Sequence, residues 1–270
     1  MRAAFRIRGL IAIVGFLISL GLTAQPALAQ PETITIAAAN SLKDALRKVL
    51  PLFEAEHRNI NVRVIYGPSQ TLRSQIEQGA PVDIFLPSLF EEIDQLEAKG
   101  LIIQGTKRAF AATSLVLITG TALPAPISTI QDLQTIPIRH IAVGDPKTSS
   151  VGKVSAQFLK YSKLEPKLKS QYVLGEHSRA VLDLVAKGEA EIGVVYRTDA
   201  ISNPGVRILD TAPVGSHTPV RYGVAAAWTA QNITAAGDFI EFLLSPTIQT
   251  QLQEFGFDRV SPEVGFAQRE

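Results

Sequence analysis

Most of the chain alternates between short continuous apolar segments and segments whose apolar residues recur every three or four positions. The first pattern predicts buried β-strands and the second predicts amphipathic helices. In the first half of the chain, the expected strands cover residues 33–39, 61–66 and 82–86. The first expected helix begins at Ser41, and the next two cover residues 71–78 and 89–99. This β-α-β-α-β order implies a parallel sheet covered by helices. Pro51 conflicts with the first helix, which it should kink or end.

A second series of the same kind follows. The apolar run at 109–118 could carry the chain out of the first lobe into a second one, and the run at 222–228 could carry it back. The remaining expected elements are strands at 138–143 and 192–196 and helices at 151–160, 178–187, 235–244 and 246–255. Two such series favour an α/β protein with two lobes, and a length of 270 residues exceeds the usual size of one domain. We assign residues 30–113 and 224–270 to the first lobe and residues 114–223 to the second.

Residues 1–29 have the features of a cleaved secretory signal peptide. Arg2, Arg6 and Arg8 precede an apolar run at 10–22, and the small-residue site Ala27-Leu28-Ala29 follows. The alternative is a membrane anchor, but the run is shorter than the roughly 20 residues that a spanning helix needs. Cleavage would make Gln30 the first residue and would place the protein in the periplasm. No later stretch is long and apolar enough to span a bilayer, so we expect no stable membrane insertion.

The composition argues against several classes of function. The chain has 26 Lys and Arg residues, of which three lie in the signal and 23 remain, against 25 Asp and Glu residues. A nucleic-acid-binding protein normally has a basic excess or a basic stripe, and neither is present here. The chain has no cysteine, which excludes disulfides, thiolate metal sites, a cysteine nucleophile and a lipid-modified N-terminal cysteine.

The sequence contains no recognisable catalytic motif, so we expect neither an enzyme nor a bound cofactor. The G-x-S-x-G elbow, the P-loop and the G-x-G-x-x-G fingerprint are all absent. The histidines lack metal-ligand spacing, and we expect each to be a surface or loop residue: His57, His140, His177 and His217. Asp145 precedes a proline and suits a turn, whereas Asp83 is expected to be a structural acceptor near a strand end.

Four places combine a strand end, small polar residues and a helix start: residues 38–41, 66–69, 144–151 and 175–178. A helix N-terminus presents unpaired N–H groups and a partial positive charge, so each place could hold an anion. Ligands of open parallel sheets gather outside the carboxyl ends of the strands, and two facing lobes could direct all four places into one cleft. The alternative is that each serine only caps its own helix, and the sequence pattern leaves both interpretations open.

Four groups of motifs can be recognised along the chain: ITIAAANSL at 34–42, SQTL at 69–72 with QIEQGAPVDIF at 75–85, AVGDP at 142–146, and GVVY at 193–196 with TDA at 198–200. Together these motifs resemble the periplasmic molybdate-binding proteins of ATP-driven importers, within the type II periplasmic solute-binding family. They occur in the order of the family and cover nearly the whole chain after the signal. The resemblance implies two α/β lobes joined by two crossing strands, with an oxyanion held in the cleft between them.

Carried over position by position, the resemblance implies five ligand-binding residues: Ser41, Ser69, Val151, Ser178 and Tyr196. Ser41 and Ser69 would donate from their hydroxyls and backbone N–H groups. Val151 and Ser178 would donate from backbone N–H groups, and Tyr196 from its phenol hydroxyl. The chain departs from the commoner pattern at Asn40, Pro68, Gln70, Val151 and Ser178, where the family more often has alanine, serine, serine, alanine and an apolar residue.

The ligand implied by the resemblance is molybdate, with tungstate as its close equivalent, and molybdenum would be bound only as this oxyanion. Molybdate is a dianion with only acceptor oxygens, so a site made of donors suits it. Monohydrogen phosphate would also want an acceptor for its proton, and no carboxylate is among the five residues. Another tetrahedral oxyanion, such as sulfate, is the alternative, since only cavity size separates it from molybdate. The resemblance further implies a monomer that delivers its ligand to an ABC transporter, a permease with its ATPase.

Overall fold

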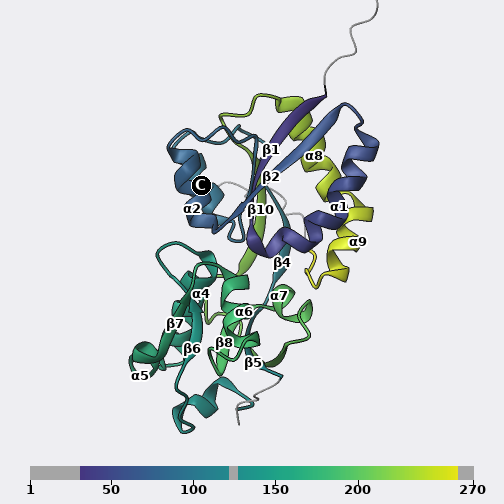
Figure 1. Cartoon of the computed structure of the whole chain (residues 1–270). Coiled ribbons are helices and arrows are strands. Elements are labelled where there is room, and N and C mark those ends of the chain that lie inside the picture. Colours follow the sequence, from purple (N-terminus) through teal and green to yellow (C-terminus); the bar gives the residue numbers. More distant parts are fainter. Residues whose placement is uncertain (1–30, 122–126, 261–270) are drawn as a thin grey trace, which may run out of the picture. The chain divides into compact units, whose positions relative to one another are not determined.

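The computed structural model describes residues 31–121 and 127–260. These residues form two mixed five-stranded sheets, each covered by helices, in a two-lobed α/β fold (Figure 1). The predicted fold class is therefore confirmed. The expected signal peptide at 1–29 lies outside the described residues. Among the helices that the structure describes, none is long and apolar enough to cross a membrane.

The sheet of the first lobe has the strand order β2-β1-β3-β10-β4. Its strands are β1 (Glu32–Ala39), β2 (Ile60–Gly67), β3 (Ile84–Leu86), β4 (Arg108–Thr113) and β10 (Val220–Ala226). The predicted parallel arrangement holds for β1, β2 and β3, whereas β10 runs antiparallel to both β3 and β4. The carboxyl ends of β1 and β2 therefore lie at the same edge of the sheet.

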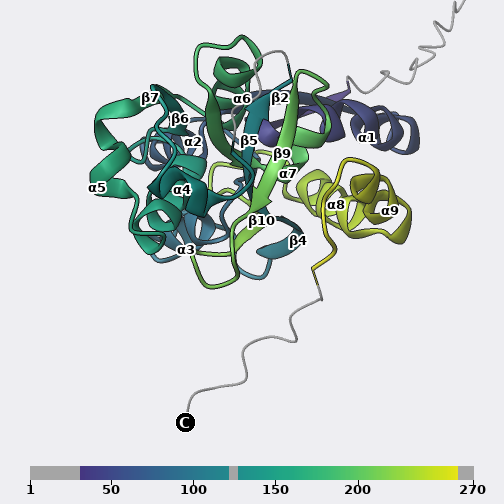
Figure 2. The ribbon, with the colours of Figure 1, turned by 90° about the horizontal axis from the view of Figure 1, so that it is seen from below.

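Helices cover both faces of this first sheet. They are the short 3₁₀ helix η1 (Asn40–Leu42), α1 (Lys43–Glu56), α2 (Ser69–Glu77), α3 (Glu91–Glu97), α8 (Ile233–Leu244) and α9 (Pro246–Glu254). Side chains of β1 alternate between two apolar clusters, with Ile36 among residues of α1, α8 and α9 and Ala37 among residues of α2 and α3. Figure 2 shows α8 and α9 next to α1. This alternation is the two-residue period of a strand that is buried on both faces.

Pro51 does not end the first helix, because α1 continues to Glu56. Of the two expected outcomes, a kink or an end of the helix, the end is therefore wrong. Phe53 lies beyond the proline, is fully buried, and packs edge-on against Phe239 and Phe242 of α8. This apolar packing stabilises the last turn of α1 although the proline lacks a backbone N–H group.

The sheet of the second lobe has the strand order β7-β6-β8-β5-β9. Its strands are β5 (Leu115–Gly120), β6 (Ile141–Gly144), β7 (Tyr172–Gly175), β8 (Ile192–Tyr196) and β9 (Val206–Thr211). Its helices are η2 (Ile130–Gln134), α4 (Ser150–Tyr161), α5 (Glu165–Leu168), η3 (Lys169–Gln171), α6 (Ser178–Ala186) and α7 (Arg197–Ile201). The apolar pattern gives no bounds for β7 or β9, because both are edge strands with only one fully buried residue each.

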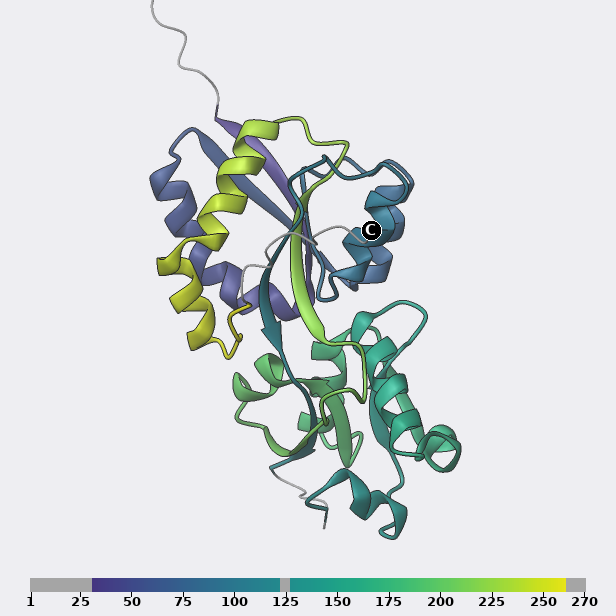
Figure 3. The ribbon, with the colours of Figure 1, turned by 180° about the vertical axis from the view of Figure 1, so that it is seen from behind.

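The chain passes between the lobes from β4 to β5 and again from β9 to β10 (Figure 3). The apolar run at 109–118 divides at Ser114 into β4, which belongs to the first sheet, and β5, which belongs to the second. The chain returns in β10, which pairs with β4 from Val220 onwards. The boundary expected between residues 223 and 224 consequently falls inside β10.

Candidate anion-binding site

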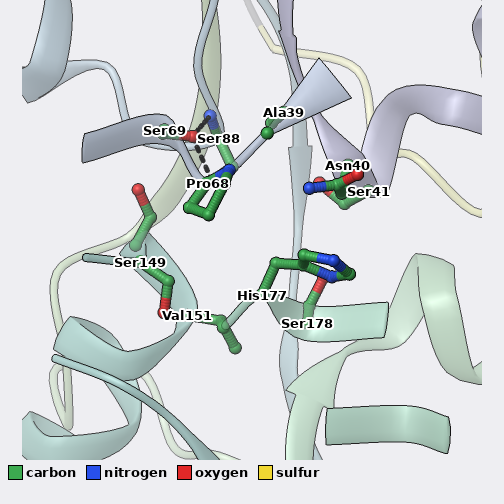
Figure 4. Close-up of a pocket in the computed structure, with 12 residues that line it drawn as sticks. Ala39, Asn40, Ser41, Pro68, Ser69, Ser88, Ser149, Val151, His177 and Ser178 are labelled. Atoms are coloured by element: carbon green, nitrogen blue, oxygen red, sulfur yellow. Dashed lines mark hydrogen bonds between the residues drawn. The ribbon is translucent and has the colours of Figure 1, made fainter. Parts of the chain in front are cut away.

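A small pocket lies between the two lobes, and its wall comes from five segments of the chain (Figure 4). The lining residues are Ala39, Asn40, Ser41, Gly67, Pro68, Ser69, Ser88, Ser149, Ser150, Val151, His177 and Ser178. All four predicted strand-to-helix junctions contribute to this wall, so the structure brings them together in one place. Of the five residues implied by the resemblance, Ser41, Ser69, Val151 and Ser178 line the pocket, and Tyr196 does not.

The N-terminal ends of η1, α2, α4 and α6 point to the pocket. The helix η1 directly follows β1, and the other three follow β2, β6 and β7 after a short turn. Because β1 is parallel to β2 and β6 is parallel to β7, these helix starts gather at one edge of each sheet. The first N–H groups of a helix lack partners inside the helix, and the helix dipole favours a negative charge there. The local geometry therefore suits a small anion.

Ser41 is held by a tyrosine that the sequence did not indicate as part of the site. The hydroxyl of Tyr222 donates to Ser41 Oγ over 2.8 Å, and Tyr222 is fully buried. Burial raises the pKa of Tyr222 well above its ordinary value, so its hydroxyl stays protonated and remains a donor. Since Ser41 Oγ already accepts this hydrogen bond, its own proton is available to an anion in the pocket.

Replacing Tyr222 with phenylalanine should weaken anion binding by roughly two- to tenfold, because Ser41 loses the hydrogen bond that orients its hydroxyl. Equilibrium titration of the purified variant measures this change. Tyr161→Phe is a matched control, because the Tyr161 side chain is 59% exposed and lies outside the pocket wall. An unchanged dissociation constant in Tyr222→Phe would show that Ser41 needs no such support.

Ser69 and Tyr196 are connected through Ser88. The backbone N–H of Ser88 donates to Ser69 Oγ over 3.1 Å, and the hydroxyls of Ser88 and Ser69 lie 3.2 Å apart. The Tyr196 hydroxyl lies 3.3 Å from Ser88 Oγ, in a position that is almost fully buried. Burial raises the pKa of Tyr196 above its ordinary value, which keeps the phenol neutral. Ser88 therefore stands between Tyr196 and the pocket, and the sequence pattern around Ser88 gave no sign of this role.

The side chain of Ser178 is engaged within its own lobe. Its hydroxyl donates to Asp199 Oδ2 over 2.5 Å, and Asp199 is fully buried. Burial raises the pKa of Asp199 to about 6, although the hydrogen bond from Ser178 and the charge of Arg179 oppose the shift. The Val151 side chain is buried in the apolar core. Both residues consequently have their backbone N–H groups, rather than their side chains, to offer to a ligand.

His177 lies in the loop between β7 and α6, as expected of a surface or loop histidine, and it is also part of the pocket wall, which was not expected. Its Nδ1 accepts the backbone N–H of Ala180 over 3.1 Å and so caps the start of α6. Desolvation lowers the pKa of His177, which favours the neutral ring. In a neutral ring that accepts at Nδ1, the proton resides on Nε2, which makes that nitrogen a donor. Sequence spacing alone could not reveal a histidine in a helix cap.

No Lys, Arg, Asp or Glu is among the residues that line the pocket. Ion pairs cross between the lobes beside it: Arg179 reaches Asp44 over 2.6 Å, and Lys153 contacts Glu91. Within residues 31–121 and 127–260, no group of His, Asp or Glu side chains could hold a bare metal ion. The wall thus provides hydrogen-bond donors to a ligand without a permanent countercharge.

The two carboxylates considered from the sequence are structural, as predicted. Asp83 accepts the backbone N–H groups of Thr35 and Gln231, each over 2.7 Å. Asp145 accepts the backbone N–H of Lys147 over 2.9 Å in the turn before α4. Neither residue lines the pocket.

A two-lobed α/β fold with a donor-lined pocket between its sheets is the architecture of a solute-binding protein. The family model described as bacterial extracellular solute-binding protein matches residues 34–258. The chain therefore belongs to this family of bacterial extracellular solute-binding proteins.

The chain is also similar to individual proteins and to a solved structure. The molybdate-binding protein ModA of Escherichia coli is 31% identical over 245 residues, which cover 86% of this chain and 91% of the relative. The putative ABC transporter substrate-binding lipoprotein YvgL of Bacillus subtilis is 29% identical over 249 residues, with coverage of 91% and 95%. The solved substrate-binding domain of a putative molybdenum ABC transporter from Clostridium difficile has a TM-score of 0.68 and 32% identity, with coverage of 85% and 99%.

Proposed function

We propose that this protein binds molybdate outside the cytoplasm and delivers it to an ABC transporter for import. The observation that carries the proposal is the pocket wall, which offers hydroxyl and N–H donors from both lobes and contains no carboxylate. A fully deprotonated tetrahedral dianion has only acceptor oxygens, so such a wall matches its chemistry. The names of the E. coli and C. difficile relatives support molybdate among the tetrahedral oxyanions.

The finer parts of the proposal follow from the same assignment. Tungstate, which has nearly the same size and charge, should bind as well. The protein acts by binding alone, without catalysis and without a cofactor, and works as a monomer with a permease and its ATPase. Residues 1–29 serve as a cleaved signal that places the protein in the periplasm. Ser41, Ser69, Val151 and Ser178 contact the anion, and Tyr196 contributes from behind Ser88.

Thermal unfolding with four anions tests the proposal. Molybdate and tungstate should each raise the melting temperature, whereas sulfate and phosphate at equal concentration should not. A ligand at 100 times its dissociation constant stabilises the folded state by about 2.7 kcal/mol. For a protein of this size, each kcal/mol corresponds to roughly 2–4 °C, so the shift should be several degrees. A sulfate shift as large as the molybdate shift would contradict the assignment of the ligand.

A further inference from the structure

Ser150 has a buried hydroxyl without a hydrogen-bond partner, and it lies in the pocket wall. The residue is 2% exposed, and its Oγ atom makes no hydrogen bond with any described residue. A buried hydroxyl that lacks a partner is unfavourable, and such groups are uncommon in folded proteins. The position of Ser150 in the pocket indicates where the partner comes from.

The adjacent serine shows what Ser150 does not do. Ser149 is the N-cap of α4: its Oγ accepts the backbone N–H of Gly152 over 3.2 Å and donates to the backbone carbonyl of Asp145 over 2.9 Å. The capping function is therefore complete without Ser150. Ser150 is the first residue of α4, where a hydroxyl is not needed to cap the helix.

The other serine hydroxyls of the second lobe in this wall are already engaged. Ser178 donates to Asp199, and Ser149 donates to Asp145. In the first lobe, by contrast, Ser41 accepts a hydrogen bond from Tyr222 and keeps a proton to donate. Ser69 accepts the backbone N–H of Ser88, and either hydroxyl can donate in its 3.2 Å contact with Ser88 Oγ. Ser150 is the hydroxyl of the second lobe in this wall whose proton is free, as that of Ser41 is in the first lobe.

We propose that the Ser150 hydroxyl donates directly to the bound oxyanion, as an additional ligand-binding residue that helps to fix the anion against the second lobe. This inference rests on the proposed oxyanion-binding function and extends the set of five residues carried over from the resemblance. The anion oxygen supplies the hydrogen-bond partner that the described residues do not give to Ser150. The hydroxyl should therefore strengthen binding while giving the empty protein no stability.

The test compares Ser150→Ala with Ser155→Ala in the full mature chain. Ser155 lies in the same helix, is fully buried, and also has an unpartnered hydroxyl, but it does not line the pocket. Both substitutions remove one buried, unpaired hydroxyl, so neither should lower the melting temperature of the empty protein. Titration with molybdate should show a loss of affinity of about ten- to a hundredfold in Ser150→Ala only.

The possible results separate this inference from the proposed function. If the wild type binds molybdate and Ser150→Ala binds it equally well, the inference is overturned and the function stands. If the wild type binds sulfate or phosphate instead, the function is overturned, and the same two variants test Ser150 with that anion. If the wild type binds none of these anions, both are overturned. Should Ser150→Ala fail to fold, Ser150→Cys preserves the side-chain size with a weak donor and should show a similar loss of affinity.

Discussion

Replacing Gly152 with alanine should abolish measurable anion binding at micromolar protein concentrations. It should also destabilise the folded protein by about 3 kcal/mol, which lowers the melting temperature by roughly 6–12 °C. Gly152 lies in the first turn of α4, directly against the end of β6. A Cβ atom there would lie 2.4 Å from the backbone carbonyl of Asp145 and 2.6 Å from the carbonyl carbon of Gly144. Neither contact can be relieved by rotating a side chain, so the helix start must move.

That movement would displace the part of α4 that faces the pocket. Ser150 and Val151 immediately precede Gly152, and both belong to the pocket wall. Hydrogen bonds to a small anion weaken steeply when donors leave their preferred distance, so even a small displacement of the helix start should be costly. Titration calorimetry and thermal unfolding measure the two effects separately.

Gly237→Ala provides the matched control for this substitution. Gly237 lies inside α8, and a Cβ atom built there meets nothing within 4 Å. Alanine is favoured over glycine in a helix, so this variant should be more stable by roughly 0.5–1 kcal/mol with unchanged affinity. Normal binding by Gly152→Ala would mean that the close contact of α4 with β6 does not determine the position of the pocket donors.

Replacement of Arg179 with methionine should destabilise the protein by about 3–5 kcal/mol at pH 8, because it leaves a buried carboxylate without its cation. Arg179 Nε lies 3.3 Å from Asp199 Oδ1, and Asp199 is fully buried. Burial already raises the pKa of Asp199 to about 6 in the presence of this guanidinium. Without the guanidinium the pKa should rise further.

The loss of stability should depend on pH in a defined direction. The pKa of Asp199 is higher in the folded state than the ordinary value of 3.8 that it has in the unfolded chain. Such a carboxyl group favours folding most when it is protonated. Its contribution is fully present below pH 3.8 and is lost as the pH rises through the folded-state pKa. The deficit of Arg179→Met relative to wild type should therefore be largest at pH 8 and should shrink as the pH falls towards 5.

Urea unfolding at several pH values measures this dependence. Arg179→Met combined with Asp199→Asn should lose the pH dependence, because the titrating group is gone. Asp44→Asn removes the ion pair between the lobes but leaves Asp199 beside Arg179, and should cost no more than about 1 kcal/mol. A deficit of Arg179→Met that stays constant from pH 8 to pH 5 would instead indicate that lost packing, and not the buried charge, explains the effect.

Local patterns were sufficient for the elements that surround the site. The strand predicted at 192–196 is β8, and the helices predicted at 151–160 and 178–187 correspond to α4 and α6. Apolar periodicity reports which residues of a short segment are buried, and the core of each lobe requires that burial. The four strand-to-helix junctions could be located for the same reason, because small polar residues at a helix start are a local signal.

Long-range pairing was not predictable from these patterns. The apolar run at 222–228 is consistent with a strand. It does not predict that this strand, β10, lies between β3 and β4 and is antiparallel to both. The edge strands β7 and β9 have too few buried residues for their bounds to be predicted, although the junction at 175–178 implied that a strand ends there. Their place in the sheet depends on backbone hydrogen bonds to distant segments, which any sequence can provide.

The sequence by itself determined the two α/β series and, through resemblance, four residues that line the pocket: Ser41, Ser69, Val151 and Ser178. Only the tertiary structure decided what each hydroxyl can do. Tyr222 leaves the proton of Ser41 free for a ligand, although 181 positions separate the two residues, whereas Asp199 engages the proton of Ser178. A hydroxyl can donate one hydrogen bond and accept others, and which of these remain for a ligand depends on partners that the folded chain brings to it from distant positions.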